Sequence, residues 1–127
     1  MELYNHLLKR ESEGKPIRIG LVGCGQMGSG FVHVTHKMQG LETFAISDID
    51  VERPKAVLKS LGIPENEICV TNKRSEAEDV VSSGKYLVTE DALLLTYMDS
   101  LDAVIEATGI TEIGAKVAWT GITNGKN

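Results

Sequence analysis

The sequence lacks the features that mark several large classes of protein. It has only two cysteines, too few for a disulfide framework. No apolar run approaches the roughly 20 residues of a membrane-spanning helix, and residues 1–15 have neither the apolar core nor the cleavage site of a signal peptide. Basic side chains number 13 against 18 acidic ones, and this net charge of -5 argues against a protein that coats nucleic acid. We therefore expect a cytoplasmic protein with neither a nucleic acid nor a membrane as its partner.

Motifs for several kinds of chemistry are missing as well. The sequence has no Walker phosphate loop, no zinc-ligand spacing and no Ser-His-Asp constellation. His33 and His36 stand three residues apart in one expected helix, but no carboxylate or cysteine cluster completes a metal site. We predict surface or packing roles for both histidines and no bound metal.

Short apolar runs alternate with amphipathic segments along the chain. The apolar runs are typical of buried parallel strands, and they predict strands at residues 17–22, 42–47 and 101–107, with further candidates at 68–70 and 86–88. Which of the last two belongs to the main sheet stays open. The amphipathic segments predict helices at residues 2–13, from Met27 to about Gly40, from Asp50 to about Leu61, from Ser75 to Gly84, from Thr89 onward and from Thr111 to Asn124.

Strands that alternate with helices across short turns favour a parallel sheet that is covered on both faces. The predicted fold class is therefore α/β, a Rossmann-type doubly wound sheet preceded by a helix. Residues 1–16 are the expected N-terminal helix and linker, and residues 17–127 the expected domain. In the helix that starts at Met27, periodicity predicts buried positions at Met27, Phe31, Val34 or Thr35, and Met38.

A G-x-G-x-x-G pattern follows the first predicted strand and opens the next helix. In a dinucleotide site the first glycine allows a tight turn, the second lets the backbone approach a pyrophosphate, and the third lets the helix pack closely on the strand. Free N–H groups at the helix start then hold the anion. Because the pattern stands between a strand and a helix, as the motif requires, we predict a cofactor-binding loop of Gly23, Cys24, Gly25, Gln26, Met27 and Gly28.

An acidic residue, Asp48, ends the second predicted strand 20 residues after Gly28. An acid at this place accepts hydrogen bonds from the adenosine ribose, and its charge would repel the 2′-phosphate of NADP. Arg53, in the next helical turn, would instead neutralise that phosphate. We predict NAD or NADP as the cofactor, with NAD favoured, and a helix-capping role for Asp50.

The end of the strand at 101–107 is the second candidate for cofactor contact. Ligands of doubly wound sheets lie beyond the carboxyl ends of the strands, at the switch in strand order, and Thr108 and Gly109 are expected there, beside the ribose or the pyrophosphate. Glu106, an acid within an apolar strand, either reaches water or acts near the nicotinamide. Cys24 is either a nucleophile or, as we favour, a small side chain tolerated beside the cofactor.

Four stretches of the chain together resemble a known family: IRIGLVGCGQMGSGFV, AISDID, LVTEDALLL and DAVIEATGITEIGAKVA. They are similar to the N-terminal nucleotide-binding domain of homoserine dehydrogenase-like oxidoreductases, closest to the branch with a downstream SAF domain that includes deoxyxylulose phosphate reductoisomerase-like proteins. The resemblance implies a pyrophosphate at the loop 23–28, a ribose at Asp48, and a cofactor that runs along Ala107, Thr108 and Gly109.

The same resemblance implies an activity and an assembly. Family members transfer a hydride between a nicotinamide and a small carbonyl or hydroxyl metabolite, and the full-length protein is expected to be a homo-oligomer. Reductoisomerase-like members use NADPH, whereas Asp48 favours NAD here.

In the family, a further strand and the region with the catalytic lysine and acids follow the last helix predicted here. The sequence stops at Asn127, so we expect a fragment with no catalytic residue, inactive alone, whose strand 101–107 is an open edge. Two alternatives stay open. One is a non-catalytic, dinucleotide-sensing module, and the other is a site for S-adenosylmethionine, which related glycine loops also hold.

Overall fold

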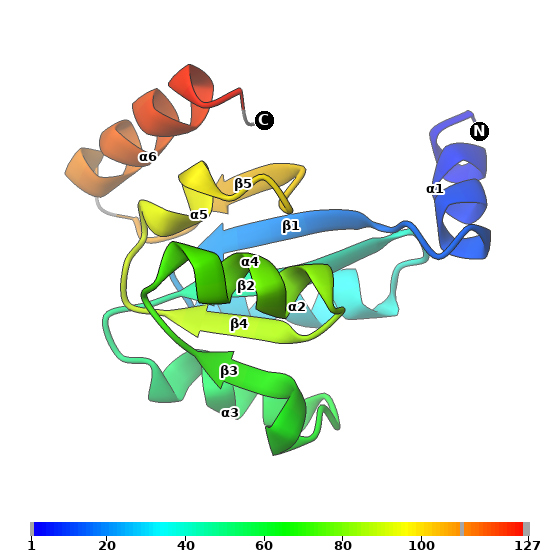
Figure 1. The fold of residues 1–127 in the computed structure, drawn as a ribbon, viewed down its shortest axis with the longest axis horizontal. Helices are drawn as coiled ribbons and strands as arrows, with labels where there is room; N and C mark the ends of the chain where they lie inside the picture. The colour runs from blue at the N-terminus through cyan, green and yellow to red at the C-terminus, as the bar shows by residue number, and fades with distance from the viewer. Residues whose placement is uncertain (1, 110, 126–127) are drawn as a thin grey trace.

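The computed structural model describes residues 2–109 and 111–125, and a five-stranded parallel sheet forms its centre (Figure 1). The strands lie in the order β3-β4-β2-β1-β5, and every neighbouring pair is parallel. The chain therefore places β2, β3 and β4 on one side of β1, with β4 inserted between β2 and β3, and then crosses back to place β5 on the other side, as in a doubly wound sheet. The strands are β1 (Ile17–Val22), β2 (Leu41–Ser47), β3 (Ile68–Val70), β4 (Tyr86–Thr89) and β5 (Ala103–Glu106).

Helices cover both faces of this sheet. Figure 1 shows α4 and α5 in front of the sheet and α2 and α3 behind it. This arrangement confirms the predicted Rossmann-type α/β fold with an N-terminal helix. Within the described ranges, no helix has both the length and the apolar character needed to cross a membrane. The helices are α1 (Glu2–Ser12), α2 (Gln26–Lys37), α3 (Glu52–Ser60), α4 (Arg74–Ser82), α5 (Leu94–Tyr97) and α6 (Thr111–Thr123), with a 3-10 turn, η1, at Glu65–Glu67.

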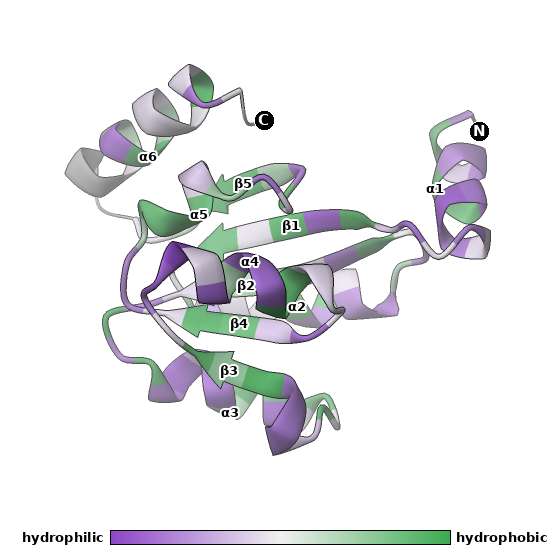
Figure 2. Cartoon of the chain, viewed as in Figure 1, coloured by the Kyte–Doolittle hydropathy of each residue, from purple (hydrophilic) through white to green (hydrophobic). Residues whose placement is uncertain are grey.

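The core lies along the central strands, where Leu21, Ile46 and Leu87 are fully buried. Because helices cover both faces, residues that point either way are buried, and the strands read as nearly continuous apolar runs. Figure 2 shows this contrast, with largely green strands and largely purple α1 and α4. β5 is half-buried at all four positions and is the edge strand of the described sheet, as expected.

Both strand candidates of the middle segment belong to the sheet. β4 lies between β3 and β2 and is buried at all four positions, whereas β3 is the opposite edge strand and more exposed. The helix expected from Thr89 begins only at Leu94 and has four residues. Its first turn is capped by Asp91, whose Oδ1 accepts the N–H groups of Leu93 and Leu94.

The buried face of α2 matches the predicted one in part. Thr35 is buried and Phe31 packs partly buried against the core, as expected, whereas Met27 is 78% exposed and Met38 42%. Gly28 and Val32 are buried instead. A Cβ at Gly28 would lie 2.1 Å from the carbonyl oxygen of Gly23, so the helix packs on the loop through its smallest residue.

The N-terminal helix docks at the amino ends of the strands, where Figure 1 shows α1 beside the start of β1. Leu7 is its buried residue. Gly40 has a φ of +79°, and a Cβ there would lie 2.0 Å from the Leu7 carbonyl oxygen. The Gly40 N–H also donates to Glu11 Oε2 at 2.7 Å. This backbone contact holds α1 against the turn between α2 and β2.

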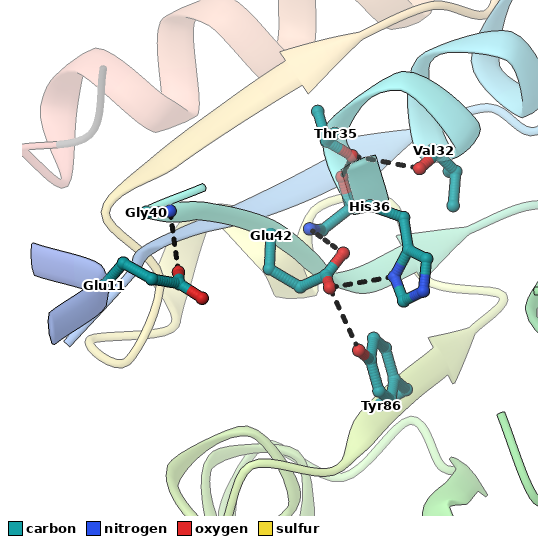
Figure 3. A network of polar contacts seen from close by, with 8 residues as sticks. Glu11, Val32, Thr35, His36, Gly40, Glu42 and Tyr86 are labelled. Carbon is teal, nitrogen blue, oxygen red and sulfur yellow. Dashed lines mark hydrogen bonds and ion pairs between the residues drawn. The ribbon is translucent and has the colours of Figure 1, made fainter. Parts of the chain in front are cut away.

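A polar network occupies the same end of the sheet (Figure 3). His36 Nδ1 lies 3.0 Å from Glu42 Oε2, and the Tyr86 hydroxyl donates to the same oxygen at 3.2 Å. Burial, and then the charge of Glu42, raises the pKa of Tyr86, so its hydroxyl remains a donor. His33 Nδ1 lies 2.9 Å from the Ser29 carbonyl oxygen. Among the described residues, no three His, Cys, Asp or Glu side chains gather as metal ligands would.

Candidate nucleotide-binding site

A pocket of about 390 Å³ lies at the carboxyl ends of β1, β2 and β5. β2 lies on one side of β1 and β5 on the other. The pocket therefore stands at the switch in strand order, where doubly wound folds bind ligands. The structure brings seven of the predicted site residues onto its wall. They are Gly23, Cys24, Gly25, Asp48, Arg53, Ala107 and Thr108.

The three motif glycines have three different surroundings. Gly23 has a φ of +95°, and a Cβ there would lie 2.9 Å from the backbone nitrogen of Thr108, so the loop packs directly on the end of β5. Gly28 packs against Gly23, as described above. A Cβ on Gly25 would meet nothing within 4 Å, which leaves the loop backbone open to the pocket. These are the roles that the motif predicts: turn, open backbone and close packing.

The N-terminus of α2 opens beside this loop. Its N-cap is Gly25, no side chain caps it, and its first turn contains no acidic residue. The first N–H groups of a helix lack partners within the helix, and the helix dipole makes this end attractive to anions. The arrangement suits a phosphate group.

Asp48 ties the loop to the end of β2. Its Oδ2 accepts the N–H of Cys24 at 2.8 Å, and its Oδ1 accepts the N–H of Asp50 at 2.9 Å. A carboxylate oxygen has more than one acceptor position, so hydrogen bonds to the backbone leave capacity for ligand hydroxyls. Asp50 Oδ1 in turn accepts the N–H of Glu52 at 3.1 Å, at the start of α3, which agrees with the predicted capping role.

The charged groups on the pocket wall are mostly acidic. Asp48, Asp50 and Glu90 line the pocket together with one basic residue, Arg53. The guanidinium Nε of Arg53 lies 3.8 Å from Asp50 Oδ2. Arg53 is thus already paired with one of these carboxylates.

Cys24 is a buried thiol, 3% exposed. Burial, and then the nearby charge of Asp48, raises its pKa to about 11, against the opposing effect of Arg53. Because the thiolate is the nucleophilic form, a thiol that stays protonated near neutral pH does not act as a nucleophile. The environment favours the small packing side chain over the nucleophile.

The end of β5 closes the pocket opposite Asp48. The N–H of Ala107 donates to the Val22 carbonyl oxygen at 2.7 Å, which fixes the strand end against β1. The Glu106 side chain is hydrogen-bonded within the protein. Its Oε1 accepts both the N–H of Thr108, at 2.7 Å, and the Thr108 hydroxyl. Gly109 follows with a φ of +71° and turns the chain away.

Four predicted residues do not line this pocket. Gln26 and Met27 are exposed on the first turn of α2, Gly28 is buried behind the loop, and Gly109 lies just past the wall. The assignment of all eleven predicted residues to a cofactor, on the wall or off it, stays a prediction.

The pocket also contains residues that the sequence analysis did not assign to it. Ser47 could have been assigned to the pocket from the sequence, because it is the polar residue directly before Asp48. Its hydroxyl is buried and has no hydrogen-bond partner in the described part of the chain. Ile49, which is 83% exposed, could have been assigned to the pocket in the same way, because it directly follows Asp48. Glu90 and Ala92 had no such signal, because they reach the pocket only through the position of β4. The added residues are Val22, Ser47, Ile49, Asp50, Glu90 and Ala92.

The fold and the glycine-loop pocket define a Rossmann-type domain, and two known proteins are similar to most of the chain. A homoserine dehydrogenase from Methylobacillus glycogenes is 26% identical over 113 residues, which are 89% of this chain and 24% of that protein. The crystal structure of scyllo-inositol dehydrogenase from Lactobacillus casei, with bound NAD(H) and scyllo-inositol, covers 89% of this chain and 27% of that one, with a TM-score of 0.62 and 19% identity. No family model matches the sequence.

These likenesses confirm the resemblance to NAD(P)-dependent oxidoreductases that the sequence motifs indicate. The chain spans about a quarter of the length of either protein. The closer placement beside the SAF-domain branch stays a prediction.

Proposed function

We propose that the chain is the nicotinamide dinucleotide-binding domain of an oxidoreductase. The observation that carries the proposal is the pocket at the switch point, where the open backbone of Gly25 and the uncapped start of α2 face the carboxylate of Asp48. Helix N–H groups suit a pyrophosphate and a strand-end acid suits a ribose. Both similar proteins are dehydrogenases by name, and one was solved with NAD(H).

The residues present fit such a cofactor. A side chain at Gly25 would fill the space that the pyrophosphate needs, and none is there. The buried Ser47 hydroxyl, without a protein partner in the described ranges, offers one more polar group at the wall. In this assignment the loop 23–28 holds the pyrophosphate, Asp48 the adenosine ribose, and Ala107 to Gly109 lie along the cofactor.

NAD is the favoured form of the cofactor. The 2′-phosphate of NADP would enter beside Asp48, where Asp50 and Glu90 add negative charge to the wall. Arg53 opposes this, but Asp50 already pairs with it. Negative charges on the wall would repel the negative 2′-phosphate. We therefore infer that the pocket prefers NAD, which lacks this phosphate, to NADP.

Calorimetric titration with NAD⁺, NADH, NADP⁺, NADPH and S-adenosylmethionine tests the assignment. We expect NAD⁺ or NADH to bind more tightly than the phosphorylated forms. An Asp48→Ala variant should bind NADH roughly 10- to 100-fold more weakly, since a hydrogen bond to a charged group contributes about 1.5–3 kcal/mol. Arg53→Ala tests the phosphorylated forms, because Arg53 is the basic residue on the described pocket wall, and it should leave the NADH affinity within about twofold.

Two results would contradict the proposal. A folded chain that binds none of the four dinucleotides has no such site. Tighter binding of NADPH that is lost in Arg53→Ala would assign the pocket to NADP instead.

We propose that the protein to which this domain belongs transfers a hydride to or from a small carbonyl or hydroxyl metabolite, and that it is a homo-oligomer, as in the family that the motifs resemble. The chain spans a quarter of its relatives, and we assign it no catalytic residue. Residues 1–127 alone should therefore bind the cofactor without turning over a substrate.

A further inference from the structure

The end of β4 adds a second carboxylate to the pocket, one strand further from the glycine loop than Asp48. Ser47 of β2 and Thr89 of β4 are register partners, and the N–H of Asp48 donates to the Thr89 carbonyl oxygen at 3.0 Å. Asp48 and Glu90, which directly follow these partners, both line the pocket. Because neighbouring strands are about 4.8 Å apart, the two acids belong to one continuous wall that starts at the glycine loop.

The backbone of Glu90 is fixed, whereas its carboxylate is not. Asn72 Oδ1 accepts both the N–H of Glu90, at 3.1 Å, and the Thr89 hydroxyl, at 2.6 Å. The next residue, Asp91, caps α5 and so holds the chain on the other side. Among residues 2–109 and 111–125, the exposed Glu90 side chain has no hydrogen bond and no ion pair. Its carboxylate can therefore accept from a ligand without losing a protein partner.

The order of the strands determines which part of a dinucleotide lies beside Glu90. In the proposed function the pyrophosphate lies at the glycine loop after β1 and the adenosine ribose at Asp48 after β2. The strand order β1, β2, β4 then leads to the base at the end of β4. Ile49 and Ala92, close in sequence to the two acids, add apolar groups to the wall, and Ile49 is 83% exposed. A flat base would cover this apolar surface.

A carboxylate discriminates between purine bases by the group at C6. It accepts hydrogen bonds and donates none. Adenine has an amine at C6, which donates, whereas hypoxanthine has a carbonyl oxygen there, which accepts. Phosphate oxygens are acceptors as well, and the adenosine hydroxyls are assigned to Asp48. The C6 amine is thus the donor of the adenosine half that is left for Glu90.

We propose that Glu90 is a specificity-determining residue that selects adenine over hypoxanthine by accepting a hydrogen bond from the amine at C6. The proposal rests on the proposed dinucleotide-binding function. It gives Glu90 a role in base selection that is separate from its repulsion of a 2′-phosphate, because both bases occur in dinucleotides that lack this phosphate.

Calorimetric titration of residues 1–127 with NAD⁺ and with its hypoxanthine analogue tests the proposal. The analogue differs from NAD⁺ only in the base, where a carbonyl replaces the amine at C6. We expect NAD⁺ to bind roughly 3- to 10-fold more tightly, the effect of about one hydrogen bond. Glu90→Gln keeps the size of the side chain, but its amide donates as well as accepts and suits either base. Glu90→Gln and Glu90→Ala should both bring the ratio of the two affinities close to one.

This ratio separates recognition of the base from the effect of charge. NAD⁺ and its analogue have the same pyrophosphate and ribose groups, so the loss of one negative charge from the protein changes both affinities alike. Glu13→Gln is the matched control, because Glu13 is exposed and is not part of the pocket wall. It removes the same charge and should leave the ratio unchanged.

Two results would overturn the proposal. A wild-type ratio at or below one would mean that the pocket does not favour the amine. A preference for NAD⁺ that Glu90→Gln and Glu90→Ala both retain would assign the selection to a group other than Glu90. If the folded wild-type chain bound neither dinucleotide, the proposed function itself would fail, an outcome distinct from equal binding of the two.

Discussion

At the scale of single residues, Gly28 is the clearest case of a side chain that the fold excludes. A Cβ at this position would lie 2.1 Å from the Gly23 carbonyl oxygen, which is backbone that cannot simply rotate away. We expect Gly28→Ala to lower the free energy of unfolding by roughly 1–3 kcal/mol, the usual cost of overpacking, and to weaken NADH binding by displacing the loop. Urea denaturation and calorimetry measure the two effects.

Gly30 is a matched control in the same helix. It is exposed, and a Cβ there would meet nothing within 4 Å. Alanine is a better helix former than glycine by about 0.5–1 kcal/mol, so Gly30→Ala should stabilise the chain. A Gly28→Ala variant as stable as Gly30→Ala would show that α2 does not depend on close contact with the loop.

The second prediction at this scale concerns the thiol of Cys24. With a pKa of about 11, it should be only about one part in a thousand thiolate at pH 8. We expect iodoacetamide to modify Cys24 slowly in the folded chain and to modify the half-buried Cys69 first. Mass spectrometry of the labelled peptides follows both sites. Labelling of Cys24 at the rate of Cys69 would contradict the burial of the loop thiol.

At the scale of elements, α4 is tied to the loop that precedes β5 by one carboxylate. The oxygens of Glu78 accept the N–H groups of Asp99 and Ser100 and the Ser100 hydroxyl, at 2.7–3.2 Å. Burial alone would raise the pKa of Glu78, but these hydrogen bonds, together with Arg74, outweigh it and lower the pKa below 4.5. The ionised form is thus favoured in the folded chain.

A pH dependence of stability follows from this lowered pKa. Glu78 stabilises the folded chain fully above its unfolded pKa, and that contribution is lost as the pH falls from about 4.5 through the lower folded value. Glu78→Gln should therefore destabilise the chain at pH 7 and do so less at pH 3. Chemical denaturation at both pH values measures the difference.

Glu13→Gln provides the comparison, because Glu13 is exposed and has no side-chain hydrogen bond or ion pair among the described residues. It should change stability little at either pH. A Glu78→Gln effect that is the same at pH 7 and pH 3 would show that the carboxylate does not hold the loop through its charge.

At the scale of the whole molecule, the sheet has a protected centre and two less protected edges. β1, β2 and β4 each pair on both sides, whereas β3 and β5 pair on one. Buried strands that are bonded on both sides open only with the whole fold, and edges open at lower free energy. We expect amide hydrogen exchange to be slowest in β1, β2 and β4 and faster in β5, as NMR can resolve by residue. Equal protection of β5 and β2 would mean that something covers the β5 edge.

Much of the fold could be predicted from local pattern. Apolar runs predicted the strands, and the Gly23 to Gly28 motif predicted the place of the candidate pocket, because its turn, open backbone and helix packing depend on neighbours in sequence. The burial of Gly28 in place of Met27 could not be predicted this way. Periodicity ranks residues by hydrophobicity, whereas the helix packs where the smallest residue, Gly28, allows the closest approach.

The sequence by itself determined the α/β class, the glycine loop and the acid at the end of β2, since each depends on residue type and short spacing. Only the tertiary structure decided that β4, not β3, lies beside β2, and so brought Glu90 to the same pocket as Asp48. It alone placed the Glu106 carboxylate between Thr108 and Gly114. These contacts join elements distant in the chain, and their partners are set by how helices and strands pack, which no local pattern specifies.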